Sequence, residues 1–248
     1  RLSANYLNDF TPAVLEDGRI IYSRWEYVDR PAIPIQSLWT MHPDGTGLQV
    51  FFGNRVLSPA TFMEARSIPG TDLVLCLLTA HNGPCRGGVG IIDRRMGVNA
   101  QDAIRNLTPE VDIGRVDAGD GNHVRGGYEN PYPLNDTHFL VSPFGDIVIC
   151  DYEGREIATL LTARDDMGFY NPRPVRVTAP PPTTPSMTAD ARTEGEALAM
   201  ARIYLQDVYQ GLEPHVKRGE VAAIRVVEEV AKPVEISPAL RAFGFQFP

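Results

Sequence analysis

The sequence lacks the cysteine patterns that mark redox proteins and disulfide-stabilised secreted domains. It contains only three cysteines, Cys76, Cys85 and Cys150, and none belongs to a Cys-x-x-Cys pair or a Cys-x-x-Cys-His haem-attachment motif. An odd count excludes a complete set of intramolecular disulfides. Because Cys76 and Cys150 lie in apolar, strand-like runs, we expect them to be small buried side chains.

Long apolar runs and an excess of basic residues are also missing. The longest apolar run, residues 73–78 (LVLCLL), is far shorter than the ~20 residues that span a bilayer. The chain opens at Arg1 with no signal-peptide pattern, which leaves its compartment open. Lys and Arg number 23 against 31 Asp and Glu, a net charge of -8. We therefore expect neither membrane insertion nor binding to nucleic acid, which requires a basic surface.

Common catalytic motifs are absent as well. There is no His-Glu-x-x-His, no Gly-x-Ser-x-Gly and no P-loop. The glycine-rich run Gly87-Gly88-Val89-Gly90 precedes an apolar strand pattern rather than a helix. Since phosphate binding by such loops uses a helix N-terminus, the run predicts no nucleotide site.

The sequence does contain an internal repeat rich in turn residues, with 22 Gly and 21 Pro. Residues 10–53, 58–109 and 129–162 each contain four short strand patterns in the same order. In each unit an acidic residue follows the third pattern: Asp44, Asp93 and Asp151. Repeats of this length with four strands are typical of β-propeller blades. An all-β sandwich with coincidental turn spacing is the alternative.

The predicted fold class is therefore all-β, a partial propeller of about three four-stranded antiparallel blades within residues 1–170. Three blades do not close a propeller, which usually has four to eight. We expect the missing blades to lie upstream of Arg1 or to come from another chain. Residues 171–186 are rich in proline and predict an extended linker. Residues 187–248 predict the start of a second β-rich domain, with a hairpin at residues 201–230.

Candidate binding residues follow the second strand pattern of the first two units. The first unit has Ser23 to Arg30 (SRWEYVDR) there, and the second has Thr79 to Arg86 (TAHNGPCR). Equivalent positions on neighbouring blades share one face of a propeller, so the two segments are expected to lie on the same rim. Cation–π packing and salt bridges are a structural alternative for the first segment. The candidates are Arg24, Trp25, Glu26, Tyr27, Arg30, His81, Asn82, Arg86 and His123.

A metal site is a weaker hypothesis for the same rim. His81 and Cys85 could both ligate a soft metal ion, but a site needs a third ligand from elsewhere, such as His123. We therefore predict no metal site, no cofactor and no catalytic residue in this chain.

Several segments also resemble a known family. The segments EDGRIIYSRWEYVDR, SLWTMHPDGTG, ARSIPGT and TAHN…GGVGIID look like the TolB-type propeller repeats of a bacterial family related to the hydrazine synthase alpha subunit. The tail IYLQDVYQGLEPHVKRGEVAAIRVVEE resembles the start of that family's middle domain. The resemblance implies an extracytoplasmic protein with c-type haems in domains further towards the C-terminus. No haem ligand of the family can be carried over to this chain.

Three functions remain as hypotheses. The first is a non-catalytic propeller that acts as a scaffold or interaction segment for other domains or subunits of a larger, haem-bearing parent protein. The second is an enzyme segment whose rim contributes to a redox active site shared with other domains. Haem-attachment motifs downstream in the full gene would favour this second hypothesis. The third is a sugar- or peptide-binding propeller, which the aromatic residues Trp25, Tyr27 and Trp39 permit.

Overall fold

The computed structural model describes residues 2–3, 5, 7–26, 34–186 and 205–225. These residues form twelve β-strands and two short 3₁₀ helices, which confirms the predicted all-β class. Within the described ranges, no helix is long and apolar enough to cross a membrane. The strands are β1 (Asn8–Val14), β2 (Ile20–Trp25), β3 (Ser37–Met41), β4 (Gln49–Phe52), β5 (Thr61–Ser67), β6 (Val74–Thr79), β7 (Gly87–Ile92), β8 (Ile104–Asn106), β9 (Tyr128–Pro133), β10 (His138–Pro143), β11 (Ile147–Asp151) and β12 (Glu156–Leu161).

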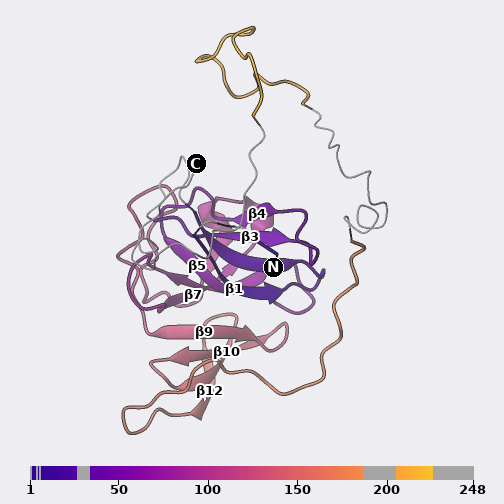
Figure 1. Cartoon of the computed structure of the whole chain (residues 1–248). Helices are drawn as coiled ribbons and strands as arrows, with labels where there is room; N and C mark the ends of the chain where they lie inside the picture. The colour runs from indigo at the N-terminus through magenta and orange to yellow at the C-terminus, as the bar shows by residue number, and fades with distance from the viewer. Residues whose placement is uncertain (1, 4, 6, 27–33, 187–204, 226–248) are drawn as a thin grey trace, which may run out of the picture.

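The strands group into three antiparallel meanders of four, here called units 1, 2 and 3 (β1–β4, β5–β8 and β9–β12). Unit 1 is a separate sheet, whereas units 2 and 3 are joined by the single pairing of Gly87 with Tyr128. The units are stacked in propeller-like fashion, with unit 3 at the lower end in Figure 1. The three strand groups fall where the repeat predicts them, which supports blades over a coincidental sandwich pattern.

The repeated acidic residues close the third strand of each unit in the same way. A carboxylate oxygen of Asp44, Asp93 and Asp151 accepts a hydrogen bond from the backbone N–H two residues later, at 2.9, 3.1 and 3.0 Å. Such Asx turns bend the chain locally without help from tertiary contacts. The repeat in the sequence is therefore a repeat of turn chemistry as well as of strands.

Two apolar clusters hold the units together. One lies between units 1 and 2 and includes Phe52, Phe62 and Leu78. The other lies between units 2 and 3 and includes Leu75 and Phe139. Successive side chains of β6 point to opposite faces, so this central strand contributes to both clusters and is buried along its whole length.

The end of the units that carries the β2–β3, β6–β7 and β10–β11 connections is here called the loop rim. Residues 107–127, which connect β8 to β9, cover this rim. The Ser58 hydroxyl donates to the Ile113 carbonyl at 2.6 Å, and the Leu57 N–H donates to the Val116 carbonyl at 2.9 Å. The long insertion in the second unit is thus bound to the end of unit 1.

The tail differs from its prediction. In place of the hairpin expected at residues 201–230, the described residues 205–225 form turns and contain no strand. Gly211 and Gly219 have φ values of +87° and +97°, and Pro214 lies between them, so the chain turns too often for a strand to extend. The rest of the predicted second domain lies outside the described residues.

Removing one aromatic ring between units 1 and 2 should destabilise the whole fold. The Phe62 side chain is 1% exposed, and its ring meets that of Phe52 edge-to-face at 5.3 Å. We expect Phe62→Ala to lower the free energy of unfolding by about 3–5 kcal/mol in urea titrations. Phe144→Ala, at a side chain that is 76% exposed, should change it by less than about 0.5 kcal/mol. Equal losses for the two variants would contradict the assigned packing.

Candidate functional site

The loop rim brings together the two segments that the sequence singles out. The Trp25 ring at the end of β2 meets the His81 ring after β6 edge-to-face, with centroids 5.0 Å apart. The Gln36 side-chain amide lies 3.0 Å from His81 Nδ1. His81 is partly buried, which lowers the pKa of its ring and favours neutral imidazole. Units 1 and 2 therefore meet at Trp25, Gln36 and His81, on the same rim as expected.

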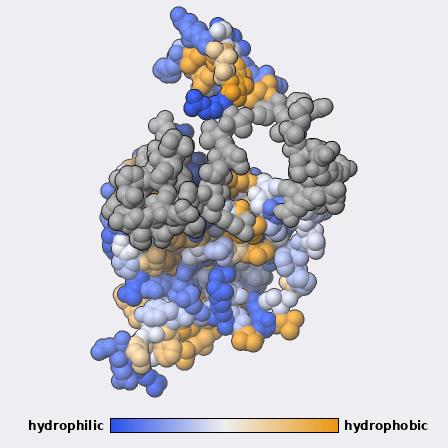
Figure 2. Space-filling view, viewed as in Figure 1, coloured by the Kyte–Doolittle hydropathy of each residue, from blue (hydrophilic) through white to orange (hydrophobic). Residues whose placement is uncertain are grey.

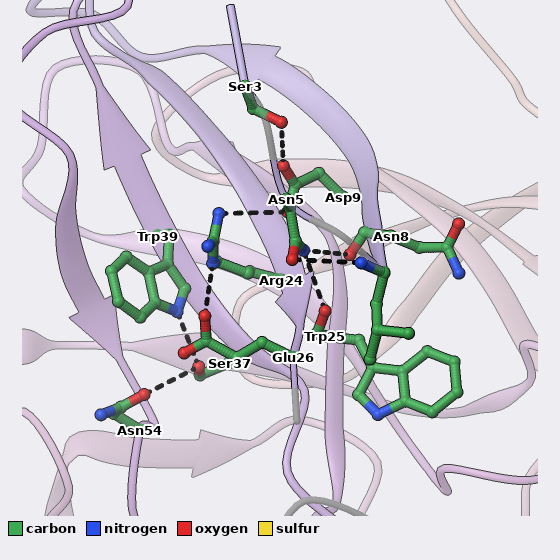
Figure 3. Close-up of polar contacts among 11 residues, drawn as sticks. Ser3, Asn5, Asn8, Asp9, Arg24, Trp25, Glu26, Ser37, Trp39 and Asn54 are labelled. Atoms are coloured by element: carbon green, nitrogen blue, oxygen red, sulfur yellow. Dashed lines mark hydrogen bonds and ion pairs between the residues drawn. The ribbon is translucent and has the colours of Figure 1, made fainter. Parts of the chain in front are cut away.

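Arg24 is a buried cation held inside unit 1 (Figure 3). Its side chain is 1% exposed, and its Nε donates to Glu26 Oε2 at 2.9 Å. Asp9 from β1 lies 3.8 Å from Arg24 Nη1, and the guanidinium lies 5.2 Å from the centroid of the Trp39 ring. A buried charge needs such partners because the interior does not solvate it. Arg24 and Glu26 thus have a structural role in joining β1, β2 and β3.

A further polar layer surrounds this ion pair. Asn5 Nδ2 donates to Asp9 Oδ1 and to the Trp25 carbonyl, both at 2.9 Å. Figure 3 shows Asn5 between these acceptors, close to the start of β1. These contacts fix the N-terminal end of β1 on β2, which keeps Trp25 in position for its contact with His81.

The remaining candidates are spread over the rim. The Asn82 N–H donates to Asn122 Oδ1 at 3.3 Å. His123 is exposed, with its Nε2 3.8 Å from Asp112. Arg86 forms an ion pair with Glu129 at the start of unit 3. Tyr27 and Arg30 lie outside the described residues.

The structure forms no metal centre from the ligands considered. Among the described residues, no group of three His, Cys, Asp or Glu side chains is arranged to hold a metal ion. Burial, followed by the negative charges of Glu64 and Glu129, raises the pKa of the Cys85 thiol. A thiol that stays protonated is a poor nucleophile and a poor metal ligand.

The first strands of the three units carry a polar feature that sequence reasoning missed. Thr11 in β1, Glu64 in β5 and Asn130 in β9 occupy equivalent positions, each at an irregularity in the strand pairing. All three have a positive φ, between 47° and 55°. Non-glycine residues seldom adopt this conformation, so three equivalent cases form a repeated β-bulge rather than an accident.

Hydrogen bonds connect these bulges from one unit to the next. The Glu64 N–H donates to Thr11 Oγ1 at 3.0 Å, and Asn130 Nδ2 donates to Glu64 Oε1 at 2.6 Å. The Asn171 N–H donates to Asn130 Oδ1 at 3.0 Å, and Asn171 itself has a φ of +54°. We call these four residues the bulge ladder. The dipeptides Thr11-Pro12, Asn130-Pro131 and Asn171-Pro172 are the sequence signal that could have revealed it.

Comparisons with known proteins give a structural likeness but no sequence match. No protein-family model and no curated protein sequence matches the chain. Among solved structures, the chain is similar to hydrazine synthase from Kuenenia stuttgartiensis, with a TM-score of 0.46 and 17% sequence identity. The match covers 65% of this chain and 20% of that chain, so the present chain spans about one fifth of its length. Membership in the family that the sequence resembles remains a prediction.

Removing the buried Arg24 charge should cost far more stability than removing an exposed one. We expect Arg24→Met to lower the free energy of unfolding by about 3–5 kcal/mol, because Glu26 and Asp9 lose their shared cation inside the protein. The control is Arg19→Met, at a partly exposed ion pair with Asp17, which should cost less than about 1 kcal/mol. Similar losses in chemical denaturation would show that the Arg24 network is not structural.

Glu64 predicts a pH dependence of stability. Burial raises the pKa of its carboxyl above the ordinary 4.5, so its contribution to stability is fully present below that value. The contribution is lost as the pH rises through the higher pKa of the folded state. We expect Glu64→Gln, which cannot ionise, to become more stable relative to the parent chain between about pH 4 and pH 7.

Urea titrations across this pH range measure the difference. Glu153→Gln, on the exposed side of the turn between β11 and β12, serves as the matched control and should show a flat difference. A fall in the stability of Glu64→Gln relative to the parent chain as the pH rises would contradict the assignment.

Proposed function

We propose that this chain is a non-catalytic interaction segment of a β-propeller, and that unit 3 binds the outer strands of a further blade. The first support is a comparison of equivalent positions. Phe51 and Phe52 end β4 and are 3% and 0% exposed, because unit 2 packs on them. Leu160 and Leu161 end β12 and are 52% and 46% exposed. An apolar position that unit 2 covers in unit 1 is thus uncovered in unit 3.

The second support is the segment at residues 169–175, which follows unit 3 where the first strand of another unit would lie. Asn171 continues the bulge ladder with the same positive φ as Thr11, Glu64 and Asn130. The Phe169 N–H donates to the Gly145 carbonyl at 2.6 Å, as the Phe62 N–H of unit 2 donates to the Gln36 carbonyl of unit 1 at 3.2 Å. The start of the predicted linker thus has the contacts of a blade's innermost strand.

The uncovered surface around this segment is apolar. In Figure 2, apolar side chains line the lower edge of the molecule, where β9–β12 lie in Figure 1. Contiguous apolar exposure of this kind marks interaction surfaces rather than ordinary monomer surface. The exposed apolar side chains of this region are Phe144, Ile157, Leu160, Leu161, Met167, Phe169, Tyr170, Val175 and Val177.

The occupant that fits is a three-stranded antiparallel meander with one apolar face. Its first strand would pair with residues 171–177, and its apolar face would cover Leu160 and Leu161. Apolar side chains likewise join unit 1 to unit 2 and unit 2 to unit 3. An extracytoplasmic location, and c-type haem in other domains of the parent protein, belong to this proposal through the sequence resemblance alone.

The proposal predicts that serine substitutions at equivalent positions of β4 and β12 have different effects on stability and on dye binding. Leu160→Ser with Leu161→Ser should reduce the binding of an apolar fluorescent dye and leave the urea midpoint nearly unchanged. Phe51→Ser with Phe52→Ser, at the covered positions, should lower the free energy of unfolding by more than about 4 kcal/mol. If the leucine pair also destabilises the chain strongly, the surface is an internal packing surface and the proposal fails.

A chain extended by surrogate strands provides the direct test. A second copy of residues 135–162, inserted after residue 177, supplies three strands of the required chemistry. We expect the extended chain to bind less dye and to unfold at higher urea than the parent chain. The control is the same insertion with lysine in place of the copied residues 139 and 141. Its dye binding and urea midpoint should stay close to those of the parent chain. Unchanged dye binding and midpoint in the first extended chain would overturn the proposal.

A further inference from the structure

A cavity of about 220 Å³ lies beside the bulge ladder. Its walls come from the first strands of all three units and from residues 171–173. One edge of the cavity is polar and consists of the bulge ladder, Thr11, Glu64, Asn130 and Asn171. The larger side chains that line it are Arg66, Tyr132 and Arg173. The cavity is thus separate from the loop rim, and its wall at residues 171–173 belongs to the segment that we propose to pair with a further blade.

Two arginines line this cavity, and the carboxyl of Glu64 on the same wall acts electrostatically on Arg66. Arg66 is half-buried, and its guanidinium lies 5.2 Å from the centroid of the Tyr132 ring. Burial, followed by the positive charge of Arg173, lowers the pKa of Arg66. Neither arginine forms an ion pair with a carboxylate among the residues that the structure describes. An anion between the two guanidinium groups would relieve their repulsion, and a carboxylate matches their planar geometry.

Glu64 adds an acceptor on the same wall. Its Oε1 accepts from Asn130 Nδ2 at 2.6 Å, whereas its Oε2 is buried and has no hydrogen-bond partner in the described part of the chain. An unsatisfied buried oxygen is costly, and native structures usually provide a donor for it. A ligand with a hydroxyl or ammonium group would supply this donor.

We propose that the cavity binds a small carboxylic acid that carries a hydroxyl or ammonium group next to its carboxylate. Arg66 and Arg173 bind the carboxylate, and Glu64 Oε2 accepts from the neighbouring donor. The cavity of about 220 Å³ has room for a small molecule of this kind. Three-carbon hydroxy acids and amino acids meet these conditions.

Ligand-observed NMR on the complete 248-residue chain tests the proposal. L-lactate and L-alanine are the two probes, and they distinguish the hydroxy-acid source from the amino-acid source. Acetate has the carboxylate alone, and ethanolamine has the donor alone. We expect lactate or alanine to bind at millimolar concentration, and acetate and ethanolamine to bind at least about tenfold more weakly. Binding of acetate as tightly as lactate and alanine would overturn the role of Glu64.

Variants assign the binding to this cavity. Arg173 is exposed on an extended segment, so Arg173→Gln should stay folded and weaken binding at least about tenfold. Arg164→Gln, at another exposed arginine nearby in the sequence, is the matched control and should bind like the parent chain. Glu64→Gln should weaken alanine more than lactate, because only the ammonium group loses an ionic partner. The proposal is wrong if neither probe binds, or if Arg173→Gln binds as well as the parent chain.

Discussion

The bulge ladder is the interaction on which the arrangement of the units depends. In each unit the first strand departs from regular pairing at one residue, and that residue bonds to its equivalent in the next unit. A positive φ at Thr11, Glu64 and Asn130 is costly for side chains with a Cβ. The cost is offset because Glu64, Asn130 and Asn171 each donate a hydrogen bond to the bulge residue before them. The ladder thereby fixes the spacing of the units as well as the shape of the strands.

The same repetition explains why burial is uneven along the chain. β6 is buried along its whole length because units lie on both sides of it, whereas every residue of β12 is exposed. Neighbouring units therefore contribute to the burial of a strand, and the exposed outer strand of unit 3 is consistent with the interaction surface that we propose.

The loop rim and the cavity beside the ladder differ in the way polar groups are used. At the rim, Arg24 and Glu26 pair with each other, and Arg86 pairs with Glu129. Beside the ladder, Arg66 and Arg173 line one cavity, and one oxygen of Glu64 has no hydrogen-bond partner in the described residues. Polar groups without a partner around a cavity favour ligand binding. The paired charges of the rim therefore have a structural role, and the cavity is the ligand site that we propose.

Much of the fold was available from the sequence, because its signals are local. Turn dipeptides, strand patterns and the acidic residues Asp44, Asp93 and Asp151 act within a few positions of one another and predict three units at the correct places. The sequence also placed the segments of Trp25 and His81 on one rim, since equivalent loops of stacked units share a rim, whereas the contact between the two rings came from the structure. The hairpin predicted in the tail does not form within residues 205–225, because the turns at Gly211, Pro214 and Gly219 outweigh the alternating pattern.

By itself, the sequence determined the all-β class, the number and limits of the units, and the turn chemistry of each. Only the tertiary structure decided which polar groups meet. The bulge ladder consists of residues of different types that are far apart in the chain: Thr11, Glu64, Asn130 and Asn171. Only the stacking of the units brings these residues together. Arg66 and Arg173 line one cavity for the same reason. Hydrogen bonds and ion pairs depend on distances of a few ångströms, and these are set by packing between units rather than by local sequence.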